Sequence, residues 1–254
     1  MTIDQADPDP DTFMPILGIR AGDMPRRVLV VGDPARAEQA STRLGDPRLV
    51  ARSREYVSYT GRHRGEEIGI VSHGVGSAGA TVCFEELCRS GVRRLIRAGT
   101  AGGMQPSIET GALVVARGAA RDDGATARLV PAGFPALADI DVVLALRAAA
   151  AAAGRDVHEG VVLTSDLFYP HSVLGSDLLM WQRSGVVAVE MECAALFVTA
   201  ALHGAAAGAI LAIDGNPLEQ HDDDMSGYKP HRSIVTQAVD QMITIALDAV
   251  AQPI

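Results

Sequence analysis

Two arginines in the chain stand where an anion could be held. Arg36 follows Gly32 by four residues at a predicted strand-to-helix turn, and Arg97 ends an otherwise apolar predicted strand. A helix N-terminus offers free N–H groups and a positive dipole end, so the Gly32–Arg36 turn is a candidate anion site. A plain tight turn with a surface Arg36 is the alternative, because turns are commoner than phosphate loops. Burying Arg97 without an anion is costly, so it should pair with a carboxylate or bind an anionic ligand.

Carboxylates follow two further predicted strands. Glu190 and Glu192 come after the apolar run 186–189, and Asp214 comes after the apolar run 210–213. Acidic side chains are almost never fully buried unless paired. We therefore expect Glu190 and Glu192 to bind a polyhydroxyl ligand or a cation. Asp214 begins the sequence Asp-Gly-Asn-Pro, a strong turn signal, so a structural role as a turn residue stays open.

Two other features have a functional and a structural interpretation. Arg52 and Arg54 alternate along the β-type segment 48–60, so both should face one side of a strand, where a solvated edge is the simpler explanation. Phe168 and Tyr169 end another predicted strand before a proline. They could stack on a flat ligand, although core packing is the commoner role of an aromatic pair.

An α/β scaffold is needed to bring these residues together. Segment 67–103 predicts a strand, a glycine loop at 74–79, a helix, a second strand and a second glycine loop at 99–103, which is a βαβ unit. Ligands of open α/β sheets bind outside the carboxyl ends of strands, so both loops should lie beside the ligand. The last predicted helix, 233–250, has an apolar stripe that faces a core.

Composition restricts the class of protein. The chain has 254 residues, 48% of them hydrophobic, and no evident interdomain linker, which suits one α/β domain with a sizeable core. The net charge of −9 argues against a nucleic-acid partner, because that needs a basic face. The three cysteines have neither zinc-site nor disulfide spacing, so a reduced, cytoplasmic setting is expected.

Two segments bear on targeting and domain limits. Residues 1–14 lack the basic start and apolar core of a signal peptide, and we expect a disordered acidic lead-in before one domain at 15–254. The stretch 193–213 is nearly all apolar and long enough to span a bilayer. His203 and Gly204 interrupt it, so a buried helix followed by a buried strand explains it better, and no membrane partner is expected.

Six segments together resemble the nucleoside phosphorylase family, which contains uridine phosphorylases and hexameric purine nucleoside phosphorylases. The nearest likeness is to the parasite type of hexameric purine nucleoside phosphorylase, in which a strand also ends in Asp-Gly before an acidic loop. The resemblance runs from about Val28 to Val250. Its segments are VVGDPAR (30–36), SREY (53–56), residues 71–100, SDLFYP (165–170), VEMECA (189–194) and AIDGNP (212–217).

The resemblance implies a three-layer αβα domain around a central mixed, partly barrel-like sheet. It implies phosphorolysis, in which a nucleoside and phosphate give a free base and ribose 1-phosphate. Inorganic phosphate is then a co-substrate, and no cofactor or metal is expected. The expected assembly is a homo-oligomer, a hexamer built as a trimer of dimers.

The resemblance also assigns roles to residues. Asp214 would protonate the leaving purine, and Phe168 would stack on the base. The ribose hydroxyls would be bound by Glu190, Met191 and Glu192. The phosphate would be bound by Gly32, Arg36, Arg97, Thr100 and, from a neighbouring subunit, Arg54.

The chemistry of glycosidic C–N cleavage agrees with these roles. Positive charge develops on the sugar, which suits glutamates and an anionic phosphate, and negative charge develops on the base, which suits a protonated acid. Asp214 would need a raised pKa to serve as that acid near neutral pH.

Three departures from the family pattern leave the substrate open. Residues 171–174 lack the Gln and Arg with which uridine phosphorylases read uracil, and the usual 5′-hydroxyl histidine falls at Ile16. The acidic loop 218–230, a lid or a plain surface loop, has Gln220 near the place of the parasite-type aromatic residue.

Alternatives to purine phosphorolysis remain. One is a uridine or broad-specificity phosphorylase. A nucleosidase is disfavoured by the three arginines, and a non-catalytic nucleoside-binding module by the intact carboxylates.

Overall fold

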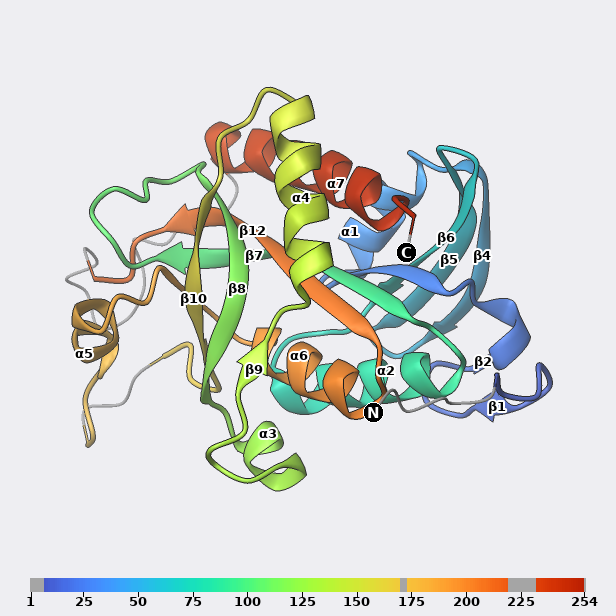
Figure 1. Cartoon of the computed structure of the whole chain (residues 1–254), viewed down its shortest axis with the longest axis horizontal. Coiled ribbons are helices and arrows are strands. Elements are labelled where there is room, and N and C mark those ends of the chain that lie inside the picture. Colours follow the sequence, from blue (N-terminus) through green and yellow to red (C-terminus); the bar gives the residue numbers. More distant parts are fainter. Residues whose placement is uncertain (1–6, 170–172, 219–231, 254) are drawn as a thin grey trace.

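The computed structural model of the protein describes residues 7–169, 173–218 and 232–253 (Figure 1). Its strands are β1 (Phe13–Met14), β2 (Ile19–Arg20), β3 (Arg27–Val31), β4 (Gly45–Ser53), β5 (Tyr56–His63), β6 (Glu66–Ser72), β7 (Arg94–Gly103), β8 (Leu113–Asp122), β9 (Ala136–Leu137), β10 (His158–Ser165), β11 (Ala188–Glu190) and β12 (Ala206–Gly215). Its helices are η1 (Ala21–Asp23, a 3-10 turn), α1 (Pro34–Ser41), α2 (Ser77–Arg89), α3 (Gly124–Leu129), α4 (Ile140–Ala152), α5 (Leu178–Arg183), α6 (Cys193–Leu202) and α7 (Ser233–Val250).

A ten-stranded mixed sheet forms the centre of the molecule. Its order is β11-β10-β8-β12-β7-β3-β6-β5-β4, with β9 beside β8. Because β11 also pairs with β7, the strands β7, β12, β8, β10 and β11 close into a five-stranded barrel. Strands β3, β6, β5 and β4 extend from β7 as an open sheet, starting with the parallel pair β7–β3, and β1 and β2 form a separate two-stranded sheet. This confirms the predicted central mixed, partly barrel-like sheet.

Helices cover both faces of the sheet, which confirms the three-layer arrangement (Figure 1). Helices α1, α4 and α7 pack on one face, where Met242 is fully buried, and α2 and α6 pack on the other with Phe84 and Phe197. Helix α7 has the bounds predicted from its apolar stripe, because that stripe meets a continuous core.

The predicted glycine loop at 99–103 is wrong, because β7 continues through Gly103. Gly99 and Gly102 pair with β12, and Gly102 and Gly103 pair with β11. A Cβ on Gly102 would lie 2.8 Å from Pro217, and one on Gly103 would lie 2.7 Å from the Ile108 carbonyl oxygen. These glycines allow close approach of neighbouring segments and do not form a turn.

The disordered lead-in predicted for residues 1–14 is wrong for residues 7–14. Phe13 and Met14 pair with β2, and the Glu86 carboxylate on α2 accepts the backbone N–H groups of Ile16 (3.0 and 3.2 Å) and Leu17 (2.8 Å). Residues 1–6 lie outside the described residues. Ile16, which stands where the family's histidine is expected, packs against the core of its own chain.

The apolar stretch 193–213 divides into helix α6 and strand β12, as predicted. Both elements are buried in the core, which explains why their sequences lack a polar face. Of the helices in the described parts of the chain, none has the length and apolar character needed to cross a bilayer.

Candidate active site

A cavity of about 980 Å³ lies at the carboxyl-terminal parts of β3, β6, β7, β10, β11 and β12. The predicted site residues that line it are Gly32, Arg36, Arg97, Thr100, Phe168, Glu190, Met191, Glu192 and Asp214. Strand ends thus converge on one cavity, as expected for an α/β sheet. Arg54 is the exception: it is exposed on the turn between β4 and β5, outside the cavity of its own chain.

Arg54 also departs from the predicted strand geometry. The structure breaks segment 48–60 into two strands at Arg54, whose φ of +55° lies in the left-handed region. Arg52 remains in β4, so the two arginines do not share one strand face. Glu55, the next residue, does line the cavity.

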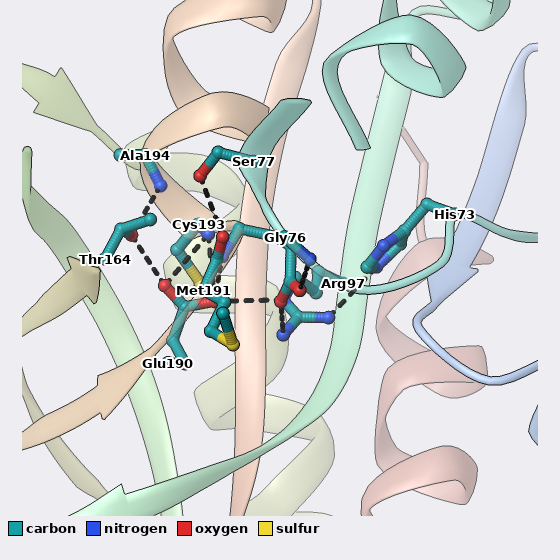
Figure 2. Close-up of polar contacts among 10 residues, drawn as sticks. His73, Gly76, Ser77, Arg97, Thr164, Glu190, Met191, Cys193 and Ala194 are labelled. Carbon is teal, nitrogen blue, oxygen red and sulfur yellow. Dashed lines mark hydrogen bonds and ion pairs between the residues drawn. The ribbon is translucent and has the colours of Figure 1, made fainter. Parts of the chain in front are cut away.

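Arg97 is the centre of a buried ion cluster (Figure 2). Its Nε donates to Glu190 Oε2 (3.2 Å), its Nη2 donates to Glu192, and its Nη1 lies 3.0 Å from His73 Nε2. Burial disfavours the cation, but the Glu192 and Glu190 carboxylates outweigh burial and raise the pKa of Arg97. Arg97 therefore pairs with carboxylates while still lining the cavity, so the two predicted alternatives are not exclusive.

Gly99 leaves the space in which the Arg97 guanidinium lies. A Cβ at Gly99 would approach Cζ and Nη2 of Arg97 to 2.7 Å and Nη1 to 2.9 Å. The side chain of Arg97 thus folds along its own strand over a residue that has none. The backbone φ of Gly99 is not positive, so its conformation does not demand glycine. Glycine is needed here only for the space that it leaves to the guanidinium.

The carboxylate of Glu190 accepts hydrogen bonds from several groups of the protein itself. One oxygen accepts the Thr164 hydroxyl (2.6 Å), the other accepts the backbone N–H of Glu192 (2.9 Å) and Arg97, and both lie within 3.0 Å of the Cys193 N–H. A carboxylate has about four acceptor sites. The Glu190 side chain, fully buried at the start of α6, therefore fixes that helix and Arg97.

The carboxylate of Glu192 accepts fewer hydrogen bonds from the protein than that of Glu190. Its Oε1 accepts the Gly76 N–H (2.6 Å) and its Oε2 accepts Arg97, so about two of its acceptor sites are left, and the residue lines the cavity. Burial raises the pKa of Glu192, Arg97 lowers it and Glu190 raises it, with a net upward shift. Gly76 has φ +91°, a conformation that suits glycine and turns its N–H toward Glu192 before α2 begins.

Part of the cavity lining has the features of an anion site. Asp33 caps α1 by accepting the Ala35 N–H (2.8 Å), and Pro34 occupies the first turn. The helix N-terminus therefore faces the cavity beside Gly32 and Arg36, with Thr100 of β7 also in its wall.

Aromatic and acidic side chains also line the cavity. Phe168 packs edge-on against Tyr169 with ring centroids 4.9 Å apart. Asp214 belongs to β12, so it is a strand residue and not a turn residue, and it is 6% exposed. Asp122 at the end of β8 also lines this part, and burial followed by the Asp177 charge raises its pKa.

Two contributors to the site, His73 and Thr164, were not singled out from the sequence. Both contact the Arg97–Glu190–Glu192 cluster, as does Gly76 of the predicted glycine loop 74–79. Thr164 carries a weak signal, as a polar residue near the end of an apolar strand. His73 carries one as well, since it stands between a strand and a glycine loop.

The cysteines take no part in a metal site or a disulfide. Cys83, Cys88 and Cys193 are buried free thiols, and burial raises the pKa of each. Within the described ranges, no group of three or more His, Cys, Asp or Glu side chains is arranged to hold a metal ion.

Two parts of the sequence prediction lie outside the described residues. They are His171 and Ser172 of the 171–174 stretch and nearly all of the 218–230 loop, with Gln220.

Comparisons with known proteins find relatives over most of the chain. A purine nucleoside phosphorylase of Plasmodium falciparum is 37% identical over 226 residues, covering 89% of this chain and 90% of that protein. A guanosine phosphorylase of Halorubrum lacusprofundi is 34% identical over 93% of this chain and 97% of that protein. A uridine phosphorylase of Treponema pallidum is 37% identical over 90% of this chain and 93% of that protein.

Solved structures show the same similarity. The purine nucleoside phosphorylase of Toxoplasma gondii in complex with immucillin-H superposes with a TM-score of 0.89 at 30% identity, covering 98% of this chain and 97% of that one. The family model of the phosphorylase superfamily matches residues 26–251. With this match over most of its length, the chain belongs to the phosphorylase superfamily.

Proposed function

We propose that the protein catalyses phosphorolysis of nucleosides, with purine nucleosides as its preferred substrates. One observation carries the proposal: the buried Arg97–Glu190–Glu192 cluster lines the same cavity as Gly32, Arg36 at the start of α1, and Asp214. The cavity lining thus combines cationic donors for an anion, carboxylate acceptors for a polyhydroxyl group and an aromatic ring for a flat base. The purine nucleoside and guanosine phosphorylases among its relatives support the same reading.

In the proposed reaction, different residues of the cavity bind the phosphate and protonate the leaving base. Phosphate binds at Gly32, Arg36, Thr100 and Arg97, and one of its oxygens forms a bond to C1′ of the ribose. The C1′–N9 bond breaks, and its electron pair passes to the purine. Asp214 donates a proton to N7 of the base, which neutralises the charge that develops there.

Ribose recognition is assigned mainly to Glu192 and the Met191 segment. Glu192 keeps acceptor sites for a hydroxyl group, whereas Glu190 is engaged by Thr164, Cys193 and Arg97. Glu190 then acts by holding Arg97 in place. Phe168 supplies a ring against which the base stacks.

Assembly and setting are part of the proposal. Arg54, exposed on its turn, would complete the phosphate site of a neighbouring subunit in a hexamer built as a trimer of dimers. The enzyme would work in the cytoplasm, with phosphate as co-substrate and without a metal or other cofactor. The buried, unpaired cysteines suit a reducing compartment.

The test is a substrate panel of inosine, guanosine and uridine, each with and without phosphate. Release of hypoxanthine from inosine only when phosphate is present supports phosphorolysis. Equal release in water alone would identify a nucleosidase. Uridine turned over faster than inosine would replace the purine preference with the uridine phosphorylase alternative, which the relative from Treponema pallidum also represents.

A further inference from the structure

His73 is a buried titratable group that the proposed reaction does not use. It follows the end of β6, has no exposed surface, and packs edge-on against Phe84 with ring centroids 5.3 Å apart. Its backbone N–H donates to the Val31 carbonyl (2.8 Å), and the next residue, Gly74, donates to Gly32 (3.0 Å). The histidine is therefore fixed to the strand end that begins the anion-binding turn.

The only role open to the ring nitrogen that faces Arg97 is that of an acceptor. His73 Nε2 lies 3.0 Å from Nη1 of Arg97, and a guanidinium carries donors but no acceptor. Nε2 must accept, so in the neutral ring the proton is on Nδ1. Burial, followed by the positive charge of Arg97, holds the pKa of His73 well below its usual value, which keeps the ring in that neutral form.

The Arg97 guanidinium is held by His73 on one side and by the two glutamates on the other. Glu190 and Glu192 take the Nε and Nη2 side of the Arg97 guanidinium, and His73 takes the Nη1 side. A guanidinium has five N–H donors. These three contacts use one N–H on each nitrogen, and the Cys193 thiol also lies within reach of the guanidinium. Because Arg97 lines the cavity, the remaining N–H groups are the ones that can meet a ligand there. Without an acceptor on the Nη1 side, Arg97 would be held from the carboxylate side alone.

We propose that His73 is a positioning residue, a neutral hydrogen-bond acceptor that fixes the plane of the Arg97 guanidinium so that its remaining N–H groups face phosphate. This assignment rests on the proposed phosphorolysis. His73 does not line the cavity, so it acts through Arg97 and not on the substrate. Its link to Val31 also couples the orientation of Arg97 to the Gly32–Arg36 turn.

The first test compares His73→Phe, which keeps a ring and removes the acceptor, with His73→Gln, whose amide oxygen can replace Nε2. Phosphate is varied at saturating inosine. His73→Phe should lower kcat/KM for phosphate by about 10- to 100-fold, the effect of losing one hydrogen bond to a charged group. His73→Gln should stay within about threefold of wild type. The matched control is His203→Phe: His203 bonds Glu85 (2.8 Å) outside the cavity, and its loss should leave kcat/KM unchanged.

The second test asks whether His73 acts through Arg97. In an Arg97→Met background, His73→Phe should add less than about a twofold loss, because the group it positions is gone. The same loss in both backgrounds would overturn the proposal, as would wild-type kinetics for His73→Phe or equal impairment of His73→Gln. If His73→Phe does not fold, His73→Met fills the site with a flexible apolar chain and serves the same comparison.

The failure of this proposal can be told apart from failure of the proposed function. Wild-type enzyme is first assayed for phosphate-dependent release of hypoxanthine, and for a rise in Tm on adding phosphate alone. Absence of both removes phosphorolysis, and the role of His73 with it. Normal wild-type behaviour with unaffected His73→Phe removes only the role of His73.

Discussion

Replacing Gly99 by alanine is a direct test of the site geometry. The substitution adds one methyl group beneath the Arg97 guanidinium, at 2.7 Å from Cζ and Nη2. The backbone φ of Gly99 is not positive, so alanine can adopt the conformation without strain. Any effect therefore comes from the displaced guanidinium.

The size of the effect follows from that distance. An ordinary carbon contact is about 3.5 Å, so the guanidinium must retreat by about 0.8 Å. The contact of Arg97 with Glu190 (3.2 Å) is already at the upper limit for a hydrogen bond, and a shift of this size would lengthen it or the His73 contact (3.0 Å) beyond that limit. A misplacement near 1 Å can cost about 100-fold in rate. This corresponds to about 2.7 kcal/mol of transition-state stabilisation.

The assay is kcat/KM for phosphate with inosine, beside thermal unfolding of the same samples. Gly99→Ala should lose about 100-fold in kcat/KM while remaining folded, because the displaced atoms end a long side chain. Gly133→Ala is the control, since a Cβ there meets no atom within 4 Å. A wild-type kcat/KM for Gly99→Ala would show that phosphate use does not require the observed position of the Arg97 guanidinium.

Three further predictions concern the acid, the assembly and pH. Asp214→Asn should slow inosine phosphorolysis by about 10²–10⁴ and uridine turnover much less; an unchanged inosine-to-uridine ratio would exclude Asp214 as the purine acid. Arg54→Ala should weaken phosphate use, and activity should fall on dilution to monomers; a fully active monomer by sedimentation would contradict this. Because the pKa of His73 is lowered by burial and Arg97, wild type should lose stability relative to His73→Gln as pH falls below about 6.5, by at most about 1.4 kcal/mol per pH unit. The measurement is urea unfolding of both proteins across this pH range. A difference in unfolding free energy between wild type and His73→Gln that stays the same at every pH would refute the prediction.

Much of the fold and the site could be predicted because local patterns agree with the tertiary structure. The apolar period of 233–250 gives helix α7 its bounds, since its stripe meets the core along the whole helix. Arg36, Glu192 and Asp214 could be grouped because strand ends in an α/β sheet meet in space. The resemblance added the barrel-like closure.

The parts that could not be predicted depend on contacts between distant residues. Gly103 looks like a loop glycine, and only the nearby Ile108 carbonyl shows that it serves close packing. The positive φ of Arg54 has no sequence signal, because arginine rarely adopts it. His73 is a lone histidine at a strand end, and its partner Arg97 is 24 residues away in sequence.

The closure of the barrel has a consequence for how the protein folds. Glu192 is 95 residues from Arg97 along the chain, and β12 must pair with β7 across more than a hundred residues. Pairings of such long sequence separation form slowly, because the entropy of closing large loops is lost before contacts compensate for it.

Arg97 lies on β7, Glu190 ends β11 and Glu192 directly precedes α6, so the charged cluster cannot exist until these segments have docked. If β7 were buried before these segments docked, Arg97 would be a buried cation without its carboxylate partners, which is strongly unfavourable. The ion cluster therefore raises the free energy of partly assembled states relative to the native state. Refolding should be cooperative at this step, with recovery of activity lagging behind recovery of helical circular dichroism.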